Sequence, residues 1–126
     1  MKRILIIEDE DRLRNMLRLS LERLGYTVAE ARDGAEGLAQ FAKHSPDLVL
    51  TDLVMPEKEG LETIQELSKR KPGLKIIAMT GGGRSDARDT LKMALHFGAS
   101  LALSKPFALD SLASAVENLL EIPALD

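Results

Sequence analysis

Carboxylates follow two apolar stretches of this chain. Glu8 and Asp9 come directly after residues 4–7, and Asp52 comes directly after residues 48–51. Carboxylates brought close together repel one another by ~4 kcal/mol per pair at the effective dielectric of a protein site. Such a cluster requires a cation, and oxygen ligands with room for water suit Mg²⁺ better than zinc or copper. We therefore predict a magnesium site that includes Glu8, Asp9 and Asp52.

Groups that suit a phosphate follow two further apolar stretches. Thr80 supplies a hydroxyl, Gly81 offers a backbone N–H that no side chain obstructs, and Lys105 supplies a positive charge. Groups of these kinds stabilise a phosphoryl group during its transfer. Asp52 is then the candidate nucleophile, because aspartyl phosphates are a known type of covalent intermediate. The predicted catalytic residues are Asp52, Lys105 and Thr80, with Gly81 as a further phosphate-binding residue.

These side chains converge only if the stretches before them are strands of one parallel sheet. Five short apolar or β-branched runs alternate with segments of helical spacing, at residues 4–7, 27–31, 48–51, 76–80 and 101–103. This alternation predicts an α/β fold, a doubly wound five-stranded parallel sheet flanked by five helices. Ligands bind beyond the carboxyl ends of the strands in such a sheet, which is where the predicted site residues lie.

Local signals give the expected boundaries of the helices. These are Gly25 after the first helix, Ser45 and Pro46 after the second, Gly60 near the start of the third, Gly98 after the fourth and Asp110 as N-cap of the fifth. Four methionines are expected to fill gaps in the core: Met16, Met55, Met79 and Met93.

Composition favours a single domain and argues against several classes of function. The chain has 126 residues, 44% of them apolar, which is enough for one core but too short for two ordinary domains. A net charge of −3 and 3% aromatic residues argue against direct nucleic-acid binding. The sequence shows no cysteine, no signal-peptide pattern and no run of membrane-spanning length. We expect a cytoplasmic protein with one domain at residues 1–121 and a C-terminal tail at residues 122–126.

Four motifs occur in the same order as in a known family. They are Glu8–Asp9 after the first strand, Asp52 in D-L-V-M-P with Gly60 following, Thr80 at the end of the fourth strand, and Lys105–Pro106–Phe107 after the fifth. With these motifs the chain resembles the receiver domain of two-component response regulators, of the chemotaxis-regulator type, over residues 2–120. The resemblance implies a flavodoxin-like fold with strand order 2-1-3-4-5.

The resemblance also implies roles for individual residues. Asp52 would be phosphorylated by a sensor histidine kinase or a phosphotransfer protein. Mg²⁺ would be held by Glu8, Asp9, Asp52 and the main-chain carbonyl of Val54. Lys105 would contact the phosphoryl group, Thr80 would move to bond it, and the Lys105–Pro106 peptide bond would be cis.

A signalling module rather than an enzyme with a separate substrate follows from the same resemblance. Such a domain catalyses only its own phosphorylation and dephosphorylation. Its output is contact with another protein, or self-dimerisation through the face formed by the fourth helix, the fifth strand and the fifth helix.

The chain departs from the family pattern at the switch. Receivers usually carry an aromatic residue three positions before the lysine, where this chain has Ala102. The segment GGGRSDARD at residues 81–89 makes the connection between Thr80 and Lys105 longer than is usual. We hypothesise that this glycine-rich loop becomes ordered when phosphate binds and so serves as an alternative switch. Val54 and Gly82 cannot orient an attacking water through their side chains, which predicts a long-lived phosphoryl group.

Three other functions are compatible with parts of the pattern. A Mg²⁺-dependent phosphatase of the haloacid-dehalogenase type would need an acid two positions after the nucleophile, where Val54 stands. A nucleotide or flavin binder would use residues 80–83, TGGG, as a phosphate cradle but would leave the three carboxylates beside an anion. A receiver-like scaffold that is never phosphorylated would account for Ala102 but not for the acidic cluster.

Overall fold

The computed structural model describes residues 2–53, 57–81 and 87–121, and within them the side chains other than those of residues 57–59 and 87–91. The strands are β1 (Arg3–Ile7), β2 (Thr27–Ala31), β3 (Leu48–Asp52), β4 (Lys75–Thr80) and β5 (Leu101–Ser104). The helices are α1 (Asp11–Arg23), α2 (Gly34–His44), α3 (Glu57–Arg70), α4 (Ala87–Phe97) and α5 (Leu109–Glu121). The predicted tail at residues 122–126 lies outside the described residues.

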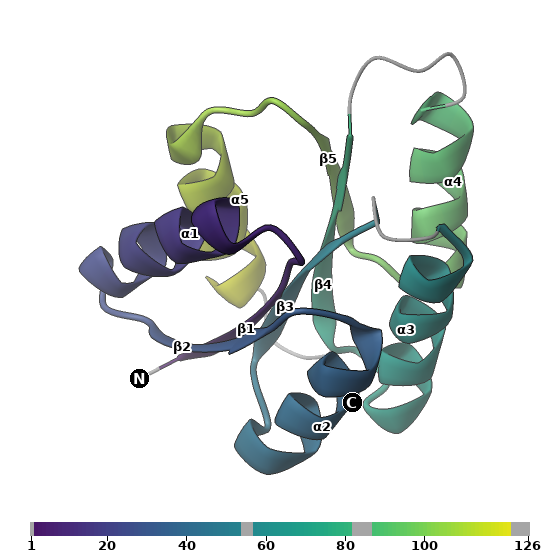
Figure 1. Ribbon diagram of the computed structural model, residues 1–126, viewed down its shortest axis with the longest axis horizontal. Coiled ribbons are helices and arrows are strands. Elements are labelled where there is room, and N and C mark those ends of the chain that lie inside the picture. The colour runs from purple at the N-terminus through teal and green to yellow at the C-terminus, as the bar shows by residue number, and fades with distance from the viewer. Residues whose placement is uncertain (1, 54–56, 82–86, 122–126) are drawn as a thin grey trace.

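All five strands are parallel, in the order β2-β1-β3-β4-β5. The predicted fold class and strand order are therefore confirmed. Helices α1 and α5 cover one face of the sheet, and α2, α3 and α4 cover the other (Figure 1). Because chain order reverses between β1 and β3, the carboxyl ends of these two strands lie side by side, with Ile7 opposite Thr51. Glu8 and Asp52 are the next residues along the two strands.

Two apolar layers, one on each face of the sheet, hold the helices in place. Alternate strand residues belong to opposite layers, as the two-residue period of a strand requires. Leu5 and Ile7 pack with Ile64 and Leu67 of α3, whereas Ile4 and Ile6 pack with helices α1 and α5 on the other face. Every residue of β3 is buried, which explains why its sequence reads as an unbroken apolar run before Thr51. This central strand gives Asp52 a fixed position.

The starts of two helices differ from the sequence predictions. Helix α3 begins at Glu57, not near Gly60, because its first turn is polar and lacks an apolar residue to mark it. Helix α5 begins at Leu109, so Asp110 lies in its first turn and is not the N-cap. The backbone N–H groups of Ser111 and Leu112 both donate to the Ala108 carbonyl, which starts the helix before Asp110.

The methionines also differ from expectation. Met79 is buried, but Met16 in α1 and Met93 in α4 are 46% and 47% exposed. Met55 lies outside the described residues. Amphipathic spacing predicts which side of a helix faces the core, but it does not say which apolar residues on that side are fully buried.

Gly98, which follows α4, offers a test of the fold. Its φ of +126° is unfavourable for any residue with a side chain, and an added Cβ would lie 2.9 Å from the Cβ of Ser68 in α3. Gly25, after α1, has a φ of +97° and free space around it. We expect Gly25→Ala to lower the free energy of unfolding by about 1–2 kcal/mol for the backbone alone. Gly98→Ala should cost about 1 kcal/mol more because of the collision. Urea denaturation of both variants measures the difference, and equal losses would contradict the close α3–α4 packing.

No helix among the described residues is long and apolar enough to cross a membrane.

Candidate functional site

The acidic residues predicted from the sequence lie together at the carboxyl ends of β1 and β3. The side chains of Glu8 and Asp52 are each 1% exposed, while Asp9 faces solvent. One carboxylate oxygen from each of the three residues lies within 4.8 Å of the others. The neighbouring parallel strands β1 and β3 thus bring two buried carboxylates and one exposed carboxylate together at their carboxyl ends.

Lys105 joins the buried carboxylates. Its Nζ lies 3.0 Å from Oε1 of Glu8 and 3.1 Å from Oδ2 of Asp52. The backbone N–H of Lys105 donates to the carbonyl of Thr80 at 2.7 Å, which continues the pairing of β4 with β5 beyond Ser104. The Lys105–Pro106 peptide bond is cis. Lys105 therefore reaches from the edge strand across β4 to the ends of β3 and β1.

Burial dominates the electrostatics of Glu8. Burial and, to a smaller extent, the negative charge of Asp52 raise the pKa of this carboxyl, while bonds from the Glu10 N–H and from Lys105 lower it, and the net result is a pKa of about 7. Burial opposes the charge of Lys105, but its bonds to Glu8 and Asp52 and their negative charge outweigh this and raise its pKa. In the protein without a metal, Glu8 is therefore partly protonated near neutral pH while Lys105 stays charged.

Thr80 brings a hydroxyl to the same edge. It ends β4, is 3% exposed, and its Oγ1 has no hydrogen-bond partner within the described parts of the chain. Gly81 follows it and is exposed. Leaving a buried hydroxyl without a partner costs ~1–3 kcal/mol. The Thr80 hydroxyl is thus available to bond an anion at the strand ends.

Removing this hydroxyl is expected to stabilise the unmodified protein. Thr80→Val keeps the shape of the side chain and removes the buried polar atom, so the free energy of unfolding should rise by about 1 kcal/mol. Thr51→Val is the matched control, because Thr51 is equally buried and its Oγ1 donates to the Asp52 carbonyl at 3.5 Å. Urea unfolding compares the two variants. A loss of stability in Thr80→Val as large as in Thr51→Val would mean that the hydroxyl has a partner.

Three parts of the chain that were predicted to act in the site or the switch lie partly or wholly outside the described residues. Val54, whose carbonyl was predicted as a metal ligand, and Gly82 are not described. The glycine-rich segment is described only at Gly81 before α4 begins. Ala102 is described: it is half-buried in β5, paired with Ala78, on the face covered by α4.

Arg14 of α1 belongs to the site but was not predicted from the sequence. Its guanidinium donates from one nitrogen to the Glu8 carbonyl at 2.9 Å and from another to Oδ1 of Asp11 at 2.6 Å. The spacing of Asp11 and Arg14 indicates an i,i+3 ion pair on a helix. The bond to Glu8 depends on how the chain turns from β1 into α1, for which the sequence carries no such signal.

The acidic group fits a hard divalent cation. All three side chains offer oxygen, the donor that Mg²⁺ prefers, and no sulfur or imidazole is among them. The three oxygens lie within 4.8 Å of one another, so a single ion could contact all of them. A divalent cation would also offset the repulsion between the carboxylates, which the positive charge of Lys105 already reduces.

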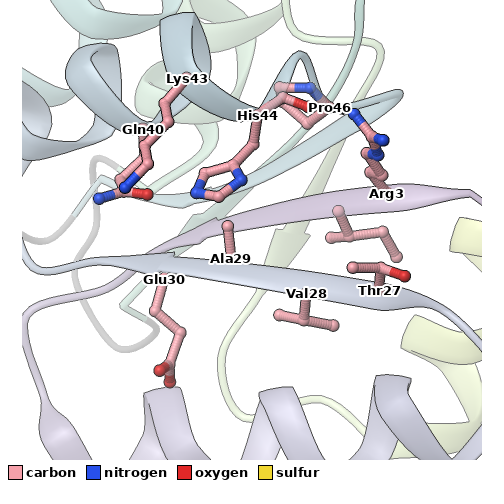
Figure 2. A pocket seen from close by; sticks show the side chains of 10 residues that line it. Arg3, Thr27, Val28, Ala29, Glu30, Gln40, Lys43, His44 and Pro46 are labelled. Carbon is pink, nitrogen blue, oxygen red and sulfur yellow. Dashed lines mark hydrogen bonds between the residues drawn. The ribbon is translucent and has the colours of Figure 1, made fainter.

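A separate cavity of about 590 Å³ lies between β2 and α2. Its lining includes Arg3 and Thr27, at the amino ends of β1 and β2, and Lys43 and His44 at the end of α2 (Figure 2). The cavity follows β2 from Thr27 to Glu30, and none of the predicted site residues that the structure describes lines it.

Known proteins resemble the chain over almost its whole length. A model of the response regulator receiver domain matches residues 4–117. The chemotaxis protein CheY of Halobacterium salinarum is 33% identical over 119 residues, which are 94% of this chain and 97% of that protein. The response regulator MprA of Mycobacterium ulcerans is 37% identical over 98% of this chain, which spans only 52% of MprA.

Solved structures show the same likeness. A CheY-like response regulator receiver domain protein from Methanospirillum hungatei superposes with a TM-score of 0.87 and 30% identity, over 96% of this chain and 94% of that one. A response regulator receiver domain protein from Clostridium thermocellum gives a TM-score of 0.86 and 32% identity, over 95% and 94% of the two chains.

Proposed function

The chain belongs to the response regulator receiver domain family of two-component signalling, and we propose that Asp52 is the residue that accepts its phosphoryl group. One observation carries this proposal. Asp52 is buried at the end of the central strand, beside two further carboxylates and 3.1 Å from the Nζ of Lys105. A carboxylate held in this way faces a cation and is oriented to attack an electrophile.

Phosphoryl transfer to Asp52 would proceed as a displacement at phosphorus. An Oδ atom of Asp52 attacks, and the P–N bond of a phosphohistidine on a kinase or phosphotransfer protein breaks. The imidazole nitrogen leaves with the electron pair and takes up a proton. The Asp52 carboxylate loses its negative charge when it is phosphorylated, so it no longer holds the Lys105 ammonium. Lys105 would then bond the negatively charged phosphoryl oxygens instead.

Mg²⁺ is the cofactor that we assign to the acidic group. Glu8, Asp9 and Asp52 would hold it, and it would supply positive charge to the phosphoryl oxygens when bound. The partly protonated Glu8 would release its proton as the ion enters. Phosphatases of the haloacid-dehalogenase type use a second acid near the nucleophile to act on a separate substrate. This chain has Val54 at that position, so we do not assign it such an activity.

Thr80 and Gly81 are the proposed phosphate-binding residues beside Lys105. The support is the buried Thr80 hydroxyl, which has no partner within the described residues, and its location one strand from Asp52. A phosphoryl group on Asp52 would give this hydroxyl an acceptor. With Ala102 in place of an aromatic residue, we assign the switch to Thr80 and the segment that follows it.

The output of the domain is a protein contact in this proposal. Met93 and Leu95 of α4 and Leu109 of α5 are 47%, 48% and 38% exposed. In this proposal, an output partner or a second copy of the chain covers these exposed apolar side chains of α4 and α5. The source of the phosphoryl group would be a sensor histidine kinase or a phosphotransfer protein.

Incubation with a small phosphodonor tests the proposal. The purified protein is mixed with phosphoramidate in excess Mg²⁺ or in EDTA, and intact-mass spectrometry follows the modification. We expect one phosphoryl group per chain with Mg²⁺ and almost none in EDTA, because the carboxylates then repel the incoming anion. Equal incorporation under both conditions would contradict the metal-dependent mechanism, and none under either would contradict phosphorylation.

A further inference from the structure

We propose that Arg14 is a positioning residue, which holds the turn from Glu8 to Glu10 in the conformation that binds the metal ion. This inference rests on the Mg²⁺ site proposed above and assigns to it a residue outside the ligand set. Arg14 is an α1 residue whose side chain is only 14% exposed, although it carries a full charge. Burial of a charged guanidinium is tolerated where acceptors at fixed positions accept hydrogen bonds from its planar set of N–H groups.

Hydrogen bonds hold the turn at four backbone groups, the N–H and the carbonyl of Glu8 and of Glu10. The Glu8 N–H donates to the Ala31 carbonyl at 3.0 Å, and the Glu8 carbonyl accepts from Arg14 at 2.9 Å. The Glu10 N–H donates to Oε2 of Glu8 at 3.1 Å, while the Glu10 carbonyl accepts the backbone N–H of Arg14 at 2.9 Å. Arg14 thus contacts the turn through both its main chain and its side chain. Of these bonds, only the one from the guanidinium depends on a side chain outside the turn.

Two acids orient the guanidinium. Asp11 accepts from it at 2.6 Å, and Oε1 of Glu30 in β2 lies 3.8 Å from its Nε. Figure 2 shows the Glu30 side chain extending from β2 toward the helix beside it, away from Lys43 and His44. Glu30 also lies 3.4 Å from the Nε of Arg18, the next arginine on this side of α1. Arg14 and Arg18 therefore share Glu30, but only Arg14 is hydrogen-bonded to Glu8.

The positioning role and a purely electrostatic role predict opposite results. If Arg14 acted only through its charge, removing it would make the acidic group more negative and strengthen Mg²⁺ binding. If it fixes the turn, removing it leaves Glu8 and Asp9 less well placed and weakens binding. Residues that orient metal ligands from outside typically change affinity by ~10–100-fold. Because Arg14 acts on a ligand's main chain, we expect about tenfold, the lower end of that range.

Calorimetric titration of the full chain with MgCl₂ distinguishes these roles. We compare Arg14→Gln with Arg18→Gln, which loses an equal charge and its own contact with Glu30 but no bond to the turn. The expected result is about tenfold weaker Mg²⁺ binding in Arg14→Gln, and unchanged or tighter binding in Arg18→Gln. Arg14→Lys keeps the charge without the planar fork and should also bind more weakly than the unchanged protein.

Urea unfolding in EDTA measures stability separately. Tighter binding in Arg14→Gln, or affinities in both glutamine variants equal to that of the unchanged protein, would overturn the proposal even if both lose stability. If Arg14→Gln does not fold, Arg14→Lys decides by the same criterion. The proposed function fails by a different result, the absence of phosphoryl uptake by the unchanged protein.

Discussion

Asp52→Asn is expected to take up no phosphoryl group under conditions in which the unchanged protein takes up one. The amide is similar in shape to the carboxylate, so the β3 strand and its burial should persist. It lacks the negative charge and the nucleophilic oxygen that attack phosphorus, and no other buried carboxylate ends the central strand. Intact-mass spectrometry after reaction with phosphoramidate and Mg²⁺ measures the result.

Asp110→Asn is the control for this variant. Asp110 is an exposed acid in the first turn of α5, so the same chemical change there should leave uptake unaltered. Urea unfolding of both variants checks that they are folded. One phosphoryl group on folded Asp52→Asn would show that another residue is the acceptor, and the assignment of Asp52 would be wrong.

Lys105→Met is expected to lower both the free energy of unfolding and the rate of phosphorylation, without weakening the binding of the metal ion. Removing the ammonium leaves the carboxylates of Glu8 and Asp52 buried without their shared cation. We expect the free energy of unfolding in EDTA to fall by about 2 kcal/mol, less than for a fully buried pair because Lys105 is 21% exposed. Loss of one charge that stabilises the transferring group should slow phosphorylation by about 100-fold.

Mg²⁺ should restore much of the stability lost in this variant. The ion would replace the missing positive charge, so its affinity for Lys105→Met should be at least that for the unchanged protein. Urea unfolding with and without Mg²⁺, together with the initial rate of phosphoryl uptake, gives both quantities. Arg70→Met, in which a partly exposed i,i+4 ion pair with Glu66 is lost, is the control and should change neither by much. A full rate of phosphorylation in Lys105→Met would contradict the role of Lys105.

The acidic group of Glu8, Asp9 and Asp52 could be predicted from the sequence because its residues lie at the carboxyl end of a strand or within two residues of it. The carboxyl ends of parallel strands lie at the same end of the sheet, so Glu8 and Asp52 had to lie at that end. Their direct adjacency depends on the pairing of β1 with β3, and strand order came from the resemblance to a family. The bridge from Lys105 to both carboxylates depends on the path of the chain after β5.

Features that depend on side-chain partners could not be predicted in this way. The burial of Thr80 follows from its strand, but the lack of a partner for its hydroxyl among the described residues appears only in three dimensions. Arg14 reads as an ordinary charged residue of an amphipathic helix, although its guanidinium binds the backbone of the acidic turn. Asp110 reads as an N-cap, yet backbone bonds to Ala108 begin the helix before it. The role of Arg14 thus depends on a tertiary contact, whereas the start of α5 is set by local backbone bonds.

Chemical trapping of the modified residue tests the assignment of Asp52 most directly. Borohydride reduces an acyl phosphate to an alcohol, which converts a phosphorylated aspartate into homoserine. The unchanged protein is reacted with phosphoramidate and Mg²⁺, reduced, digested and sequenced by mass spectrometry. We expect homoserine at position 52 and at no other aspartate. Homoserine in place of Asp9, or a phosphoryl group on His44 or His96 with position 52 unmodified, would contradict the assignment.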